Sequence, residues 1–137
     1  MSTAISERET HEYLKSLTVL YVEDEVVSRE LCSEFLSRLV GKLVTAQNGE
    51  EGLDAWRQHK PDIIITDIQM PVLDGLDMLQ RVHTFNTTIP AIVLSAFEMP
   101  VALAESSDHG LLRHEFKPVT GKKLEDALLE CANSLTE

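Results

Sequence analysis

The fold is decided by the stretch "DIIITDIQMPVLDG", residues 62–75. Three consecutive isoleucines are typical of a strand buried in a parallel sheet, yet this run leads straight to the carboxylate of Asp67. A charge at the edge of a core costs free energy, so another group should compensate for it. Pro71 cannot extend a strand, and Asp74-Gly75 favours a turn before a new helix. We therefore expect the loop to leave Asp67 exposed at a strand tip, although an ordinary loop between a strand and a helix would use the same residue types.

Strands and helices are expected to alternate along the chain. Short apolar runs predict five strands, over residues 18–22, 42–46, 62–66, 90–95 and 111–116. Apolar residues with helical spacing predict five helices, over residues 26–39, 49–59, 75–83, 98–108 and 121–135. This alternation is typical of an α/β protein with helices on both faces of a parallel sheet, that is, a doubly wound (βα)5 fold in three layers.

The predicted helix over residues 26–39 carries an apolar residue at every fourth position, and this row is expected to face the core. The row consists of Val27, Leu31, Phe35 and Leu39, with Cys32 and Leu36 beside it. The second cysteine, Cys131, also falls on the apolar side of a predicted helix, and no C-x-x-C spacing indicates a metal site. We expect two buried free thiols, and a disulfide or a reactive thiol is the alternative.

The bulk composition excludes several classes of protein. A chain of 137 residues suits one domain, and its net charge of −11, from 12 basic and 23 acidic residues, argues against direct binding of nucleic acid. No apolar run approaches the roughly 20 residues of a membrane span, and the polar N-terminus is not typical of a secretory signal. We therefore expect a cytoplasmic protein with no membrane partner. The excess of acids is either a solvated surface or, in part, a cluster that binds a cation.

Polar side chains mark the ends of four predicted strands. They are Glu23, Asp24 and Glu25 after the first strand, Asp67 after the third, Ser95 at the end of the fourth, and Lys117 after the last. Ligands of open α/β sheets bind beyond the carboxyl ends of the strands, so these groups are expected to form one site. The alternative is that each residue only caps its own strand.

This set of groups suits phosphoryl transfer. Carboxylates that lie close together resist ionising together, and a hard cation such as Mg²⁺ relieves the repulsion. An ammonium and a hydroxyl can then bind further phosphoryl oxygens, and a carboxylate can serve as the nucleophile. The sequence lacks the nucleotide-binding patterns G-x-x-x-x-G-K-[ST] and G-x-G-x-x-G, so the phosphoryl donor need not be a nucleotide.

Four segments together resemble the receiver domain of two-component response regulators. The segments are "VLYVEDE" (19–25), "DIIITDIQMPVLDG" (62–75), "VLSA" (93–96) and "FKPV" (116–119). The resemblance runs from about residue 17 to the end, which leaves residues 1–16 as an N-terminal extension with a helical turn or two and residues 17–137 as the receiver domain. It implies a flavodoxin-like sheet with strand order 2-1-3-4-5.

The resemblance implies a phosphoacceptor and a metal site. Asp67 would be the phosphoacceptor. Glu23 and Asp24 would hold Mg²⁺ together with Asp67, and the backbone carbonyl of Gln69 would complete the protein ligands. Mn²⁺ would be able to substitute for Mg²⁺.

The resemblance also implies three phosphoryl-binding or switch residues. Lys117 would pair with Asp67 and then with a phosphoryl oxygen, and its bond to Pro118 is expected to be cis. Ser95 would move to donate to the phosphoryl group. His114 stands where the family usually has an aromatic residue that swings inward, and its titration would make the switch sensitive to pH. The alternative is an exposed histidine on an edge strand with no such role.

Two further positions tune dephosphorylation in the family. Gln69 lies two residues after Asp67, and Phe97 lies two residues after Ser95. An amide at the first position can orient an attacking water, and a ring at the second can block it. Phe97 as ordinary hydrophobic cover is the alternative.

The resemblance thus predicts a signalling switch and not an enzyme that turns over a metabolite. A histidine kinase or phosphotransfer protein would donate the phosphoryl group, and the face built by helix 98–108, strand 111–116 and helix 121–135 would pass the signal to a downstream effector domain or protein. The alternatives are a degenerate receiver that acts as an interaction module and a Mg²⁺-dependent aspartyl-phosphate phosphohydrolase. The sequence leaves open a phosphorylation-dependent homodimer, and whether the chain is a complete regulator or a piece of one.

Overall fold

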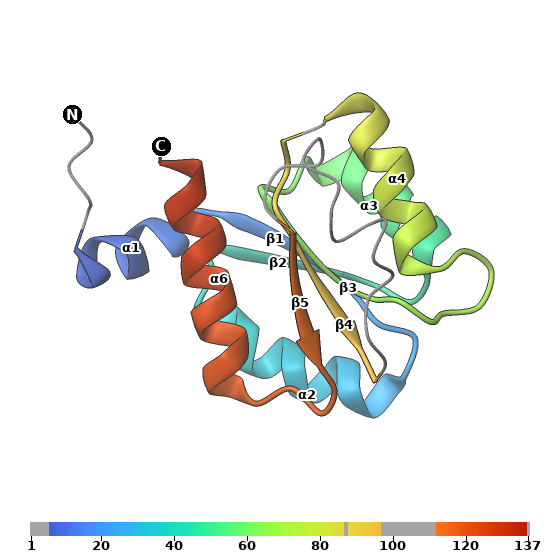
Figure 1. Ribbon diagram of the computed structural model, residues 1–137, viewed down its shortest axis with the longest axis horizontal. Helices are drawn as coiled ribbons and strands as arrows, with labels where there is room; N and C mark the ends of the chain where they lie inside the picture. Colours follow the sequence, from blue (N-terminus) through green and yellow to red (C-terminus); the bar gives the residue numbers. More distant parts are fainter. Residues whose placement is uncertain (1–5, 87, 97–111, 137) are drawn as a thin grey trace.

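The computed structural model describes residues 6–86, 88–96 and 112–136 (Figure 1). The five strands are β1 (Thr18–Val22), β2 (Lys42–Ala46), β3 (Ile63–Asp67), β4 (Ala91–Ser95) and β5 (Leu112–Phe116). The helices of this part of the chain are α1 (Glu7–Leu14), α2 (Val26–Ser37), α3 (Gly49–His59), α4 (Gly75–Phe85) and α6 (Gly121–Leu135). The predicted helix over residues 98–108 lies outside the described residues. The other predicted elements are present, with ends that differ by two residues at most.

The strands form one parallel sheet in the order β2-β1-β3-β4-β5, which confirms the predicted topology. The register places Asp67 of β3 beside Leu94 of β4, and Ser95 of β4 beside Phe116 of β5. The carboxyl ends of these strands therefore meet at one edge of the sheet, where a site was expected.

Helices cover both faces of the sheet, which gives the three predicted layers (Figure 1). Alternate side chains of each strand point to opposite faces. One core cluster joins α1, α2 and α6 to Val19, Tyr21, Ile63, Ile65, Ile92 and Leu94. The other joins α3 and α4 to Leu20, Val22, Ile64, Ala91 and Val93. Because both faces are covered, the central strands carry apolar residues on both faces instead of alternating apolar with polar ones.

The N-terminal helix α1 is a full eight residues long. Ser6 caps it through its side chain, and Glu9 completes a capping box. The helix lies against α6, where Leu14 is fully buried and His11 Nε2 lies 3.5 Å from Glu125 Oε2. The extension therefore contributes to the core beneath α2 and α6.

The orientation predicted for the first turns of α2 is wrong. Val27 is 60% exposed and Leu31 is 65% exposed, whereas Leu36 is fully buried. A row with four-residue spacing drifts by about 40° around a helix at each step, because four residues turn the chain by about 400°. Only the later members of the row, Phe35 and Leu39, reach the core cluster.

The two cysteines differ in burial. Both are free, as expected, and Cys131 is fully buried. Cys32 is only half-buried, which corrects the prediction for this residue. No helix in the described ranges combines the length and the apolar character that crossing a membrane requires.

Candidate functional site

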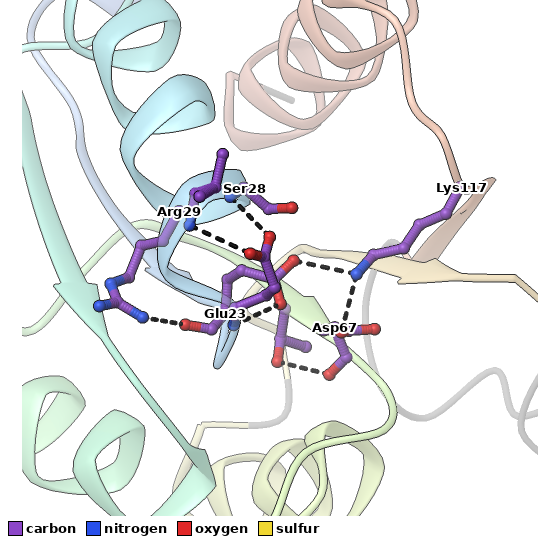
Figure 2. Close-up of polar contacts among 8 residues, drawn as sticks. Glu23, Ser28, Arg29, Asp67 and Lys117 are labelled. Carbon is purple, nitrogen blue, oxygen red and sulfur yellow. Dashed lines mark hydrogen bonds and ion pairs between the residues drawn. The ribbon is translucent and has the colours of Figure 1, made fainter.

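The carboxyl ends of β1, β3 and β5 are joined by one ammonium group. Lys117 Nζ lies 2.8 Å from Asp67 Oδ2 and 2.9 Å from Glu23 Oε1. Figure 2 shows the Lys117 side chain reaching from the end of β5 over both carboxylates. The charge that ends the isoleucine run is thus compensated by a residue 50 positions away in the sequence.

Asp67 is buried, which corrects the expectation of an exposed strand tip. Only 7% of the residue is exposed. The loop after β3 folds back over it, and the Gly75 N–H donates to the Ile68 carbonyl at 2.8 Å. A Cβ at position 75 would lie 1.9 Å from the Asp67 carbonyl oxygen, so only glycine allows this close approach.

Glu23 is almost completely buried and is held from several sides. Its backbone carbonyl accepts a hydrogen bond of 2.8 Å from Arg29 Nη1 (Figure 2). Its Oε2 accepts from the Glu25 N–H at 3.3 Å. The Glu25 side chain itself caps α2 by accepting from Val27 N and Ser28 N, so it does not join the other acids.

Glu23, Asp24 and Asp67 form a cluster of three carboxylates. One ligand oxygen from each lies within 4.8 Å of the others. Partial desolvation and a hydrogen bond with the neighbouring Glu23 raise the pKa of Asp24. Lys117 offsets only part of the negative charge of the three acids, and such a set of hard oxygen donors fits a divalent cation such as Mg²⁺. Gln69 lies exposed two residues after Asp67, and the role of its carbonyl stays a prediction.

The ammonium stays charged in this acidic cluster. Partial burial of Lys117 lowers its pKa, but the hydrogen bonds and charges of Asp67 and Glu23 outweigh this effect, so the pKa of Lys117 lies above its ordinary value. Lys117 is therefore available as a fixed positive charge next to the predicted nucleophile. The Lys117-Pro118 bond is cis, as expected.

Of the predicted switch residues, Ser95 ends β4, His114 lies in the middle of β5, and Lys117 directly follows β5. Ser95 is buried, and its carbonyl accepts a hydrogen bond of 2.8 Å from the backbone N–H of Lys117. His114 is half-buried, and its ring stands edge-on to Phe116 with centroids 4.6 Å apart. Its Nε2 is buried and has no hydrogen-bond partner among the described residues. His114 is therefore not an exposed edge-strand residue. Phe97 lies outside the described part of the chain.

The model of the response regulator receiver domain family matches residues 19–129. The chain belongs to this family. The predicted flavodoxin-like fold of a two-component receiver domain is thereby confirmed.

Known proteins resemble this receiver domain over most of its length. It is 28% identical over 110 residues to sporulation initiation phosphotransferase F of Bacillus subtilis, which covers 80% of this chain and 89% of the relative. It is 30% identical over 116 residues to the probable C4-dicarboxylate response regulator DctR of the same species; that match covers 83% of this chain but only 51% of the relative, so the chain spans about half of that regulator. Among solved structures, the CheX-CheY-BeF3-Mg²⁺ complex of Borrelia burgdorferi matches with a TM-score of 0.74 and 25% identity, over 83% of this chain and 87% of the other.

The receiver domain also contains a polar contact that sequence reasoning missed. Arg29 reaches the Glu23 carbonyl from one turn into α2. Its target is a backbone atom, and no residue pattern marks such a contact. The side chains from different strands were predictable, because in a parallel sheet their strand ends must meet at one edge.

Proposed function

We propose that this receiver domain is a phosphoacceptor switch in which Asp67 accepts a phosphoryl group from a phosphohistidine. The observation that carries the proposal is the contact of Lys117 Nζ with Asp67 at the rim of the three-carboxylate cluster. Asp67 is a carboxylate nucleophile that a fixed ammonium orients, and it lies where a parallel sheet binds ligands.

The reaction is a transfer of one phosphoryl group between two side chains. A carboxylate oxygen of Asp67 attacks phosphorus, the bond between phosphorus and the donor imidazole nitrogen breaks, and the imidazole leaves with the electron pair and takes up a proton. Lys117 neutralises a phosphoryl oxygen as negative charge accumulates next to Asp67. The chain thus catalyses only its own phosphorylation and dephosphorylation.

The cofactor proposed for this transfer is Mg²⁺, for which Mn²⁺ can substitute. Glu23, Asp24 and Asp67 would hold the ion, with the backbone carbonyl of Gln69 as a further ligand. When bound, Mg²⁺ supplies charge neutralisation for the phosphoryl oxygens and for the crowded acids. The Borrelia neighbour, a CheX-CheY-BeF3-Mg²⁺ complex, supports this choice.

Phosphorylation would shift a two-state equilibrium at the last two strands. Ser95 would move toward the phosphoryl group, and His114 would follow through the vacated space. The backbone bond from Lys117 N to the Ser95 carbonyl supports this coupling, because it ties the phosphoryl-binding lysine to the switch serine. The output face would include β5 and α6, together with the predicted helix 98–108, and would contact a downstream effector or a second phosphorylated copy.

A protein donor is supported by apolar residues beside the acidic cluster. Val26, Val27 and Leu31 are more than half exposed on the first turns of α2, which begins two residues after Asp24. Exposed apolar side chains that adjoin a polar site are typical of a surface that binds another protein. The donor would be a histidine kinase or a phosphotransfer protein, in keeping with the name of the Bacillus phosphotransferase.

Two other functions predict different behaviour toward a small phosphodonor. A degenerate receiver would take up no phosphoryl group, and a phosphohydrolase would turn over a phosphoester many times. The hydrolase is disfavoured by Gln69, because such enzymes usually carry a second aspartate two residues after the nucleophile.

The test is to incubate the protein with Mg²⁺ and acetyl phosphate and to measure its intact mass. One added phosphoryl group is expected, and it should be lost in Asp67→Asn and on chelation of the metal. Asp54→Asn, which changes an exposed aspartate on α3, is the matched control and should be labelled like the wild type. An unlabelled wild-type protein, or multiple turnover of a phosphoester, would contradict the proposal.

A further inference from the structure

A cavity of about 610 Å³ lies at the edge of the sheet opposite to Asp67. It is bordered by the last turns of α3, α4 and α6 and by the loops that lead into β3 and β4. In Figure 1 the C-terminal ends of α4 and α6 lie in the upper half of the view, whereas the arrow of β5 points to the lower half. Lys117, which contacts Asp67, follows that end of β5. The volume falls within the range of small-molecule sites in proteins.

Two aromatic rings form one wall of this cavity. Trp56 of α3 and Phe85 of α4 have ring centroids 6.0 Å apart and planes inclined by 38°. Phe85 is 76% exposed, although it is a large apolar side chain. Ile89 and Leu135 line the cavity as well. An open apolar surface built from two rings suits a planar hydrophobic group, which would remove both rings from water.

Two cations stand at the same cavity. Arg57 Nη1 lies 3.4 Å from Asp54 Oδ1, and both side chains of this pair are more than half exposed. Because such an exposed ion pair is weak, the guanidinium remains available to a ligand. Lys60 forms no ion pair within the described ranges. The one lining carboxylate, Asp62, is engaged, because its Oδ2 accepts a hydrogen bond of 2.8 Å from Thr18 N.

The positive charge of these two residues contrasts with the net negative charge of the chain. Basic residues near the end of α3 also complement the helix dipole, which accounts for their presence at a helix C-terminus. The dipole does not require an aromatic wall beside them, and the chain as a whole carries a net charge of −11. An apolar slot bordered by cations on an acidic protein is complementary to an aromatic ring that carries a negative charge.

We propose that this cavity binds a small planar aromatic or heteroaromatic anion. The ring packs against Trp56 and Phe85, and the carboxylate, sulfonate or phosphate group lies against Arg57 and Lys60. The site is separate from the acidic cluster: Asp62 precedes the first residue of β3, and Asp67 is the last. The proposal therefore does not depend on the phosphoacceptor function.

The experiment compares two probes that share one ring system. Naphthalene-2-sulfonate is an anion and naphthalene-2-sulfonamide is neutral. Trp56 is the only tryptophan, so a single indole N–H signal in a ¹⁵N NMR spectrum reports on the cavity. The anion should shift this signal and the backbone amides of Asn86 and Ile89 in a saturable way, and it should bind about fivefold or more tightly than the sulfonamide.

Variants separate the charge from the ring surface. Arg57→Gln combined with Lys60→Asn should weaken binding of the sulfonate about three- to tenfold and leave the sulfonamide unchanged. Asparagine is chosen because Lys60 has a left-handed backbone with φ of 48°. Phe85→Ala should weaken the binding of both probes. Because Phe85 is exposed, its replacement should leave the fold intact, so misfolding would not explain the weaker binding. Two control variants should not affect the binding of either probe. They are Arg38→Gln, which changes an exposed arginine directly after α2 in a comparable ion pair, and Asp67→Asn.

Several outcomes would overturn the proposal. They are equal affinity for the two probes, sulfonate binding that survives the double variant, binding that survives Phe85→Ala, and no saturable shift of Trp56. A Trp56 signal that moves with protein concentration alone would also overturn it, because that result assigns the cavity to a second copy of the chain.

Discussion

The ammonium of Lys117 lies 2.8 Å from Oδ2 of Asp67. The same nitrogen contacts Glu23, and the backbone N–H of Lys117 donates to the carbonyl of Ser95. One residue therefore ties together the ends of β1, β3, β4 and β5. A group that binds at Asp67 and displaces the ammonium would break its contacts with both Asp67 and Glu23. The backbone bond to Ser95 connects the same residue to β4.

Replacing this lysine should destabilise the fold. Lys117→Met leaves Glu23, which is 1% exposed, and Asp67 without their shared cation. Breaking a buried ion pair on one side costs several kcal/mol, but Lys117 is 30% exposed, so we expect a loss of about 2 kcal/mol in the free energy of unfolding. Urea unfolding without metal measures it.

The matched control for this variant is Lys122→Met. Lys122 pairs with Asp126 on the surface of α6 and is 78% exposed, so its replacement should cost less than about 0.5 kcal/mol. If the free energy of unfolding falls equally in the two variants, the contacts of Lys117 contribute no more to stability than a surface ion pair does.

Mg²⁺ should stabilise the protein through Asp24. If an ion binds only the folded state, a free ion concentration of 100 times its Kd adds about 2.7 kcal/mol to the free energy of unfolding. Asp24 is exposed, so Asp24→Asn should fold normally and lose most of this gain. Thermal unfolding with and without Mg²⁺ or Mn²⁺ measures it, with Asp54→Asn as control. Equal stabilisation of wild type and Asp24→Asn would place the ion elsewhere.

The ends of the strands were the most predictable part of the site. Glu23, Asp67 and Lys117 belong to distant segments, yet a parallel sheet with known strand order has to bring them to one edge. The burial of Asp67 was not predictable, because it depends on how the loop folds back and on the close approach of Gly75.

Contacts that depend on the rotation of a helix about its own axis were also not predictable from the sequence. The row that begins with Val27 has an apolar spacing, but which part of it faces the sheet follows from the angle of α2 around its own axis. The pairing of Trp56 with Phe85 likewise requires the relative position of two helices that no shared motif links.

The lifetime of the phosphorylated protein should depend on Phe97 and Gln69. Phe97→Ala should speed dephosphorylation severalfold, because it removes the ring that is proposed to block an attacking water. Gln69→Leu should slow it, because it removes the amide that is proposed to orient this water. The measurement is the decay of the phosphorylated mass after removal of the donor. An unchanged decay in Phe97→Ala would leave this ring as ordinary hydrophobic cover.

Alkaline pH should destabilise the fold through Cys131. Burial raises the pKa of this thiol from 9.0 to about 12. Between these two pKa values the folded state keeps the thiol proton, whereas the unfolded state releases it. The contribution of this thiol to the free energy of unfolding is therefore complete below pH 9.0 and is lost as the pH rises toward 12. Between about pH 8 and about pH 11 the wild type should lose about 2.6 kcal/mol more of its free energy of unfolding than Cys131→Ala. Urea unfolding at each pH measures this difference. Equal losses of unfolding free energy in the wild type and in Cys131→Ala would contradict the prediction.

The central claim is that Asp67 itself carries the phosphoryl group, and chemical trapping tests it most directly. Borohydride reduces an aspartyl phosphate to homoserine, and tandem mass spectrometry of the digested protein locates the converted residue. After treatment with acetyl phosphate and Mg²⁺, we predict homoserine at position 67 and at no other aspartate. Conversion at Asp24, a phosphoryl group retained on a histidine, or no conversion at all would contradict the account.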